Sequence, residues 1–199
     1  MKERGISVGH TTVWRWVQRY APEINRRMRP HLKMSDTSYR LDETYVKVGT
    51  RWKYLYRAVD SAGDATEFLL SAKRDVSAAK RFFKKMMRSE HRRLPSSISV
   101  DKNAAYPEAF GASQDECIVP KDCKLRRVKY LNNVIEQDHR FIRRRRRAMQ
   151  CFRSFHTAER TLEGIESRHM MRKGQVKRLD GRDAIGQAKF VEGLFGVAA

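Results

Sequence analysis

The chain has 199 residues, of which 43 are lysine or arginine and 23 are aspartate or glutamate, so its formal net charge at pH 7 is +20. Hydrophobic residues make up 40% of the sequence, which is enough to build a core and excludes a wholly disordered chain. The length favours one main domain with a small appendage and excludes a large multidomain machine.

The charge points to the class of partner. A surface this basic attracts polyanions at long range, so nucleic acid is the leading candidate. No apolar run approaches the ~18 residues of a membrane-spanning helix, and the first ten residues do not form a signal peptide. The sequence therefore predicts a soluble, cytoplasmic protein that does not act at a membrane.

Residues 1–22 predict one amphipathic helix, which begins near His10 and ends before Pro22. As the second helix of a helix-turn-helix, it could turn Arg15 and Arg19 toward a DNA groove. An ordinary amphipathic helix with a solvated basic face explains the same pattern. A helix-turn-helix also needs a preceding helix, and few residues precede this one. The sequence therefore predicts a partial helix-turn-helix.

The next residues, 23–37, are basic and poorly periodic, and they predict a linker. The pattern then changes to stretches that are rich in aromatic and β-branched residues and separated by turns. The predicted strands are residues 39–48, 52–60 and 65–71. Together they form a three-strand meander.

A helix is predicted after the meander, from Asp75 or Ser77 to about Arg88, with an apolar stripe at helical spacing that indicates core packing. Further elements follow in this order: a strand over 97–100, a helix over 103–110, a strand over 117–119 and, near the C-terminus, a helix over 157–172. A meander followed by alternating strands and helices predicts an α/β fold, with a mixed sheet and helices on its faces.

Positive charge is concentrated in residues 121–153, which contain 12 lysines and arginines against three acids. A long helix is predicted here, from about residue 132 to residue 149. Near its end lie five consecutive arginines, Arg143, Arg144, Arg145, Arg146 and Arg147. They cannot all face one side of a helix, so part of the run is a solvated surface, but such a run favours contacts with DNA phosphates. Lys102 is a further candidate for these contacts.

Three acids form a candidate metal site. Asp42 lies inside the first predicted strand, where aspartate is disfavoured, and Asp101 follows the fourth strand, at an edge where ligands of α/β sheets gather. Glu136 lies on the first turns of the long basic helix. Carboxylates are ligands that Mg²⁺ prefers. Strand alternation places Glu43 on the opposite face from Asp42, so this prediction does not include Glu43.

Each of these acids also has a purely structural explanation. Asp42 could form a salt bridge on an edge strand, and Asp101 could cap the following helix. Glu136 could be the glutamate of a capping box with Asn133. Taken singly, none of the three acids decides between a structural and a catalytic role.

Four segments carry a joint pattern: LDETYVKV (41–48), WKYLYRAVD (52–60), VDKNAAY (100–106) and NNVIEQDH (132–139). They resemble the bacterial insertion-sequence transposases with a DDE catalytic core, and above all the sixth insertion-sequence family. Asp101 and Glu136 are separated by 34 residues, which is the spacing of that family. Its motif also has a basic residue seven positions after the glutamate, where Arg143 stands. The resemblance covers nearly the whole chain.

The resemblance implies a ribonuclease H-like core over residues 38–175 and a C-terminal tail over 176–199. It implies that Asp42, Asp101 and Glu136 are catalytic and hold Mg²⁺, for which Mn²⁺ can substitute. Water would cut the transposon end, and the released 3′-hydroxyl would attack target DNA, with two metal ions assisting. The implied partners are DNA of the nucleoid and further copies of the chain, because two transposon ends must be brought together.

Other functions are compatible with the sequence. Members of the family usually carry more helical residues at the N-terminus, so this chain is expected to be shortened. A shortened transposase could bind DNA without cutting it, as an inhibitor or a relic, but the intact set of acids favours the enzyme. A nuclease for RNA hybrids is a third function, and the helix-turn-helix remnant argues against it. Tyr106 could serve as a nucleophile, but the sequence does not place around it the arginines that a tyrosine recombinase requires.

Overall fold

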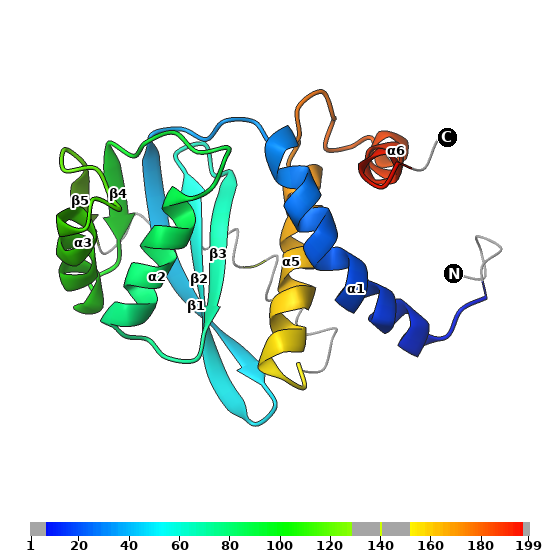
Figure 1. Cartoon of the computed structure of the whole chain (residues 1–199), viewed down its shortest axis with the longest axis horizontal. Coiled ribbons are helices and arrows are strands. Elements are labelled where there is room, and N and C mark those ends of the chain that lie inside the picture. Colours follow the sequence, from blue (N-terminus) through cyan, green and yellow to red (C-terminus); the bar gives the residue numbers. More distant parts are fainter. Residues whose placement is uncertain (1–6, 129–139, 141–151, 197–199) are drawn as a thin grey trace. The chain divides into compact units, whose positions relative to one another are not determined.

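The structure is a computed structural model, and it describes residues 7–128, 140 and 152–196. The chain divides into two compact units (Figure 1). We call Leu32–Arg153 the sheet unit, and Met1–His31 together with Ser154–Ala199 the helical unit.

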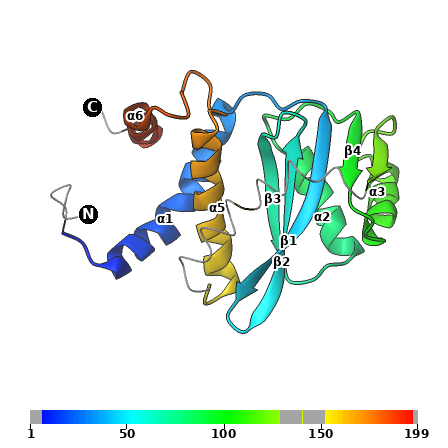
Figure 2. The same cartoon turned by 180° about the vertical axis from the view of Figure 1, so that it is seen from behind.

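The sheet unit is built on one five-stranded sheet, with the order β3-β2-β1-β4-β5 (Figures 1 and 2). Its strands are β1 (Ser38–Val48), β2 (Arg51–Asp60), β3 (Ala65–Ser71), β4 (Ser97–Val100) and β5 (Lys124–Arg127). The first three strands are antiparallel, whereas β4 is parallel to β1 and β5 is parallel to β4. This mixed sheet has the strand order of a ribonuclease H-like fold. The predicted fold class and the first four strands are therefore confirmed.

The fifth strand was predicted in the wrong place. Residues 117–119 form a turn after the third helix, in which Cys117 has a left-handed φ of 55°. Val119 is buried in the core without belonging to a strand. The actual strand, Lys124–Arg127, lies at the sheet edge and is mostly exposed, so backbone pairing with β4 holds it there rather than an apolar pattern.

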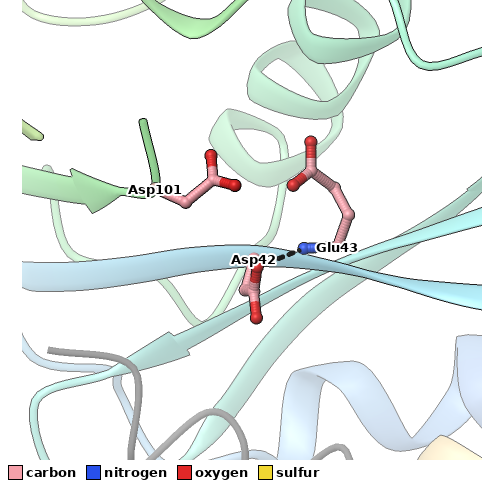
Figure 3. Close-up of side chains that lie close together, drawn as sticks. All are labelled: Asp42, Glu43 and Asp101. Carbon is pink, nitrogen blue, oxygen red and sulfur yellow. Dashed lines mark hydrogen bonds between the residues drawn. The ribbon is translucent and has the colours of Figure 1, made fainter. Parts of the chain in front are cut away.

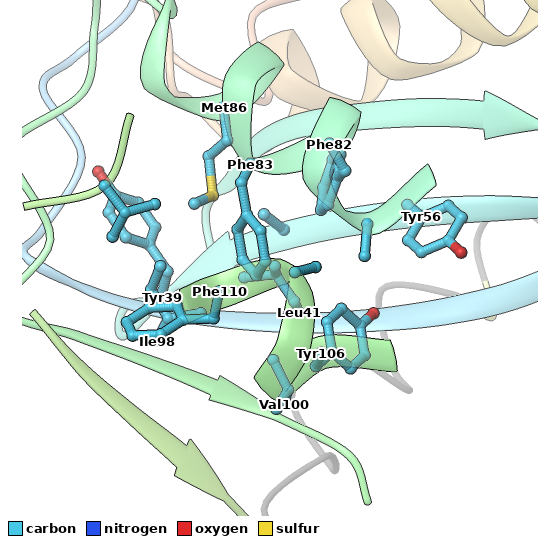
Figure 4. Packing of buried hydrophobic residues seen from close by; sticks show 14 of the residues in the cluster. Tyr39, Leu41, Tyr56, Phe82, Phe83, Met86, Ile98, Val100, Tyr106 and Phe110 are labelled. Carbon is cyan, nitrogen blue, oxygen red and sulfur yellow. The ribbon is translucent and has the colours of Figure 1, made fainter. Parts of the chain in front are cut away.

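Two helices, α2 (Val76–Met87) and α3 (Ala105–Asp115), cover the same face of the sheet (Figures 1 and 2). α2 begins at the predicted cap, because the Asp75 side chain accepts a hydrogen bond from the backbone N of Ala78 at 2.8 Å. α3 is longer than predicted. Between sheet and helices lies the core, which includes Leu41, Tyr56, Phe82, Phe83, Val100, Tyr106 and Phe110 (Figure 4). Burying each such side chain contributes roughly 1.5–3 kcal/mol.

The β1–β2 hairpin is longer than the strands beside it. Its two strands are joined by Gly49 and Thr50, and the φ of 58° at Gly49 is one that favours glycine. β4 pairs only with residues 38–40 of β1, and β3 pairs with β2 only from Tyr54 onward. The end of the hairpin therefore extends beyond both neighbouring strands of the sheet.

In the helical unit, α1 (His10–Met28) packs against α5 (Phe155–Arg172). The helices approach closely where Gly164 meets Ala21, since a Cβ at Gly164 would lie 2.8 Å from that of Ala21. Gln18 adds a hydrogen bond from its Nε2 to Oγ1 of Thr161 at 2.9 Å. The buried residues of α1 are Gln18, Ala21, Asn25 and Met28, whereas Trp14, Trp16 and Tyr20 remain exposed.

Two N-terminal predictions differ from the structure. α1 does not end before Pro22 but continues to Met28, followed by a 3-10 turn, η2 (Arg29–His31), so the predicted linker is largely helical at its start. Packing against α5 compensates for the hydrogen bond that proline cannot donate. The described part of residues 1–22 contains only one helix, so the helix-turn-helix is not confirmed.

The predicted C-terminal tail contains a further helix, α6 (Ala184–Leu194), which the sequence analysis did not identify. No residue of this helix is buried, so its sequence lacks the apolar stripe on which such predictions depend. Across the described ranges, no helix has both the length and the apolar character that crossing a membrane requires.

Candidate active site

Three carboxylates gather where β1 lies beside the end of β4. Asp42 and Glu43 are neighbours in β1, and Asp101 is the residue directly after β4. Each of the three offers one oxygen such that these oxygens all lie within 4.8 Å of one another (Figure 3). The structure therefore brings Asp42 and Asp101 together, as the sequence analysis predicted.

Glu43 is the member of this cluster that the prediction omitted. In Figure 3, the carboxylates of Glu43 and Asp101 lie on one side of β1, and Asp42 extends to the other. Oδ1 of Asp42 accepts a hydrogen bond from the backbone N of Glu43 at 2.8 Å. Alternation does separate Asp42 from Glu43, but Glu43 continues the series of Tyr39 and Leu41, which face the core. That series is the signal that could have identified it.

Arg74 and Asn103 connect Glu43 with Asp101. Arg74 donates from Nε and Nη2 to the Glu43 carboxylate at 3.4 and 3.3 Å, and its Nη2 also donates to Oδ2 of Asp101 at 3.2 Å. The side-chain amide of Asn103 donates to Oε1 of Glu43 at 3.1 Å, and its backbone N donates to Oδ1 of Asp101 at 2.9 Å. The side chain of Glu43 is only 4% exposed, whereas that of Asp101 is 29% exposed.

The charge of Arg74 is stabilised by this arrangement. Burial alone would lower the pKa of its guanidinium, but the hydrogen bonds from Arg74 to Glu43 and the negative charges of Glu43 and Asp101 raise this pKa above its ordinary value. Arg74 therefore stays cationic and balances part of the negative charge of the cluster.

Two tyrosine hydroxyls lie buried near the same acids. Among the described residues, the hydroxyl of Tyr56 has no hydrogen-bond partner, and that of Tyr106 interacts with the Glu43 carboxylate without a hydrogen bond of normal geometry. Burial raises the pKa of both phenols, and the charge of Glu43 raises it further. Tyr106 therefore remains a neutral, buried phenol at physiological pH, which argues against a role as a nucleophile.

The other predicted site residues stand apart from this cluster or lie outside the described residues. Glu136 and the arginine run 143–147 belong to the part of the chain that the structure does not describe. Lys102 is exposed and directly follows Asp101. Arg15 and Arg19 are exposed on α1 of the helical unit, where they line an open hollow.

The donor set fits a hard divalent cation. Carboxylate oxygens are the ligands that Mg²⁺ and Mn²⁺ prefer, and Mg²⁺ retains several waters when it binds. The partial exposure of Asp101 leaves room for water or a phosphate oxygen on the solvent side. The cluster can therefore hold a metal ion at the end of β4.

Solved structures with a similar fold include integrase catalytic cores. The HTLV-2 integrase catalytic core domain in complex with magnesium, in its trimeric form, aligns with a TM-score of 0.49 and 12% identity, over 66% of this chain and 84% of that one. The catalytic core domain of BIV integrase aligns with a TM-score of 0.48 and 13% identity, over 65% of this chain and 81% of that one.

Sequence comparisons identify the family. Residues 36–175 match a transposase family described as "DDE domain". The transposase for insertion sequence-like element IS431mec of Staphylococcus aureus strain Mu50 is 36% identical over 179 residues, which cover 90% of this chain and 77% of that protein. The transposase for insertion sequence element IS257 in transposon Tn4003 of Staphylococcus aureus matches to the same extent. With its clustered acids on a ribonuclease H-like sheet, the chain belongs to the DDE transposases of the sixth insertion-sequence family.

Proposed function

We propose that this transposase binds transposon ends and cuts and joins DNA with Mg²⁺ held by Asp42, Asp101 and Glu136. The catalytic core would comprise residues 38–175. The observation that carries the proposal is the meeting of Asp42 and Asp101, which come from two parallel strands, in a chain with a net charge of +20. Glu136 enters from the sequence motif, since 34 residues separate it from Asp101.

Each described side chain has a distinct part in this proposal. A bound divalent cation supplies an activated water and stabilises the leaving oxygen of the phosphodiester. Asp42 and Asp101 provide ligand oxygens from adjacent strands. Glu43 is a positioning residue, because it holds Arg74 and Asn103, and both of these donate hydrogen bonds to Asp101. The buried phenol of Tyr106 favours direct attack by water over a covalent tyrosyl intermediate.

Basic side chains would hold the DNA. Lys102 is exposed beside Asp101, so it is positioned to contact a phosphate near the site. The run Arg143 to Arg147 adds positive charge from the helix predicted to carry Glu136, and Arg15 and Arg19 add it from α1. We expect a homo-oligomer that works on DNA of the bacterial nucleoid, since two ends must be joined in one reaction.

A nicking and strand-transfer assay tests the proposal. Labelled duplex DNA that carries the sequences flanking this gene is incubated with the full chain and Mg²⁺ or Mn²⁺, next to the Asp101→Asn variant. The exposed Leu94 is a matched control, because Leu94→Ala leaves the site untouched. We expect cleavage by the wild type and by Leu94→Ala, and none by Asp101→Asn. If all three bind DNA and none cuts it, the chain is a DNA-binding inhibitor or relic instead.

A further inference from the structure

Three aromatic side chains lie together on the β1–β2 hairpin, on the face of the sheet that α2 and α3 also occupy. We call Tyr45, Trp52 and Tyr54 the aromatic platform. Tyr45 is 52% exposed and Trp52 is 54% exposed, although both are large apolar side chains. The ring of Tyr45 lies 6.4 Å from that of Trp52, nearly perpendicular to it, and 5.4 Å from that of Tyr54. More than half of the Tyr45 and Trp52 side chains is therefore accessible to solvent.

The platform is placed by the strand register. Tyr45 stands directly opposite Tyr54, and Trp52 stands opposite Lys47, so the Tyr45–Trp52 contact is a diagonal cross-strand pair. Such pairs also stabilise a hairpin, and that structural role accounts for the mutual contacts. It does not account for more than half of each side chain remaining in water, on a part of the hairpin that extends beyond β3 and β4.

Positive charge accompanies these rings on the hairpin. Lys47 lies on the same face as the rings, Arg51 and Lys53 lie on the opposite face of β2, and residues 44–54 contain no acid. Exposed aromatic faces combined with lysine and arginine are the chemistry that binds single-stranded nucleic acid, where bases stack on the rings and cations track the phosphates. Because the hairpin is basic, its charge complements the phosphates of DNA. We therefore favour DNA as the occupant over a protein surface that carries few acidic residues.

The platform also continues directly from the carboxylate cluster. One face of β1 carries every second residue, namely Glu43, Tyr45 and Lys47. Measured along the strand from Glu43, Tyr45 lies at about 7 Å and the cross-strand pair Lys47–Trp52 at about 13 Å. Stacked DNA rises about 3.4 Å per nucleotide. A strand with its phosphate at the carboxylates could therefore place a base two to four nucleotides away on these rings.

We propose that the aromatic platform stacks on an unpaired nucleobase of the DNA substrate, within about four nucleotides of the phosphate that is cut. The inference rests on the proposed function and adds a subsite to it. Stacking there would keep the two DNA strands separated next to the carboxylates. Only the phosphate backbone of the cut DNA strand would then enter the carboxylate cluster. The rings act through their faces, so the subsite would accept any base.

Binding without metal tests this subsite separately from cleavage. The full chain is titrated in EDTA, by fluorescence anisotropy, with three probes: a labelled 30-base-pair duplex, the same duplex with a single-stranded tail of four adenosines, and that duplex with four abasic residues in the tail. The abasic tail keeps the phosphates and removes the bases. We expect the wild type to bind the adenosine tail about 5- to 100-fold more tightly than the abasic tail.

Variants assign the effect to the platform. Trp52→Ala should bind the two tails equally and keep its affinity for the blunt duplex within about twofold, whereas Trp52→Phe should retain most of the preference. Leu94→Ala is the matched control, since Leu94 is another exposed apolar residue of the sheet unit. Equal binding of the two tails by the wild type, or an unchanged preference in Trp52→Ala, would overturn the subsite but not the proposed function. Failure to bind any probe at low salt would overturn both.

Discussion

Arg74 and Glu43 form a two-point pair, with Nε to Oε1 at 3.4 Å and Nη2 to Oε2 at 3.3 Å. The Glu43 side chain is 4% exposed and that of Arg74 is 34% exposed, so the pair is anchored from its buried end. The same Nη2 reaches Asp101, so Arg74, which precedes the cap of α2, is tied both to the middle of β1 and to the end of β4. The geometry of Asp101 depends on this anchor.

Removing the anchor should destabilise the sheet unit. Glu43→Ala leaves the amide of Asn103 and part of the Arg74 guanidinium without an acceptor, so we expect a loss of roughly 1–3 kcal/mol in the free energy of unfolding. Glu43→Gln keeps one acceptor oxygen and should lose less. Urea denaturation measures both. The control is Glu116→Gln, which removes the exposed ion pair with Lys80 and should cost about 0–1 kcal/mol. A Glu43→Ala protein as stable as this control would contradict the anchoring role.

Changing the ligand atoms should change the metal preference. Asp42→Asn, Asp101→Asn and Glu136→Gln should each lower Mg²⁺-dependent cleavage by at least about 100-fold, while DNA affinity stays nearly constant. Asp101→Cys presents sulfur in place of a hard oxygen, so we expect no cleavage with Mg²⁺ and partial recovery with Mn²⁺. Single-turnover nicking rates measure this. Full activity of Asp101→Cys with Mg²⁺ would show that Asp101 is not a ligand.

Replacing Arg143 to Arg147 by alanine should flatten the salt dependence of DNA binding. Each arginine that neutralises a phosphate contributes about 0.9 to the slope of log affinity against log salt. Because a helix cannot present all five on one side, we expect the slope to fall by about 2 to 3. The slope is obtained by measuring the DNA affinity of both proteins at salt concentrations from about 50 to 200 mM, a range that includes physiological ionic strength. An unchanged slope would mean that the run is only a solvated surface.

Removing the hydroxyl of Tyr106 should leave stability unchanged or raise it slightly. That hydroxyl is buried beside Glu43 without a hydrogen bond of normal geometry among the described residues, so Tyr106→Phe should cost little, within about 0.5 kcal/mol. Tyr39→Phe is the matched control. Its hydroxyl bonds to Ser35 at 2.6 Å and to the Arg93 carbonyl at 2.8 Å, so this variant should lose about 1–2 kcal/mol. Thermal unfolding distinguishes the two, and equal losses would refute the assignment.

Cys123 should react slowly with alkylating reagents until the pH is high. Burial, assisted by the charge of Asp122, raises the pKa of its thiol from 9.0 to about 11. Only about 0.3% of it is thiolate at pH 8.5, and the thiolate is the reactive form. Because the folded pKa lies above the unfolded one, the stability linked to this thiol is present below pH 9 and is lost as the pH rises toward 11. Mass spectrometry after iodoacetamide treatment should show the exposed Cys117 modified before the buried Cys123. Faster modification of Cys123 in the folded chain would contradict this.

Local patterns were sufficient to predict much of the sheet unit. The meander is visible because its strands are rich in aromatic and β-branched residues and are separated by turn residues, and α2 because Asp75 caps an apolar stripe with helical spacing. Such signals fail where an element has no apolar stripe, as in the basic edge strand Lys124–Arg127 and the exposed helix α6. They also failed at Pro22, because the packing of α1 against α5 outweighs a local helix breaker.

The sequence by itself determined the class of protein, since its charge, its strand pattern and the spacing of Asp42, Asp101 and Glu136 are properties of the chain. Only the tertiary structure decided which neighbours complete the site. Spacing and alternation did not assign Glu43, Arg74 or Asn103 to the site, and they meet Asp101 because the sheet places β4 beside β1. Hydrogen bonds between residues far apart in sequence depend on that strand order, and no local periodicity encodes it.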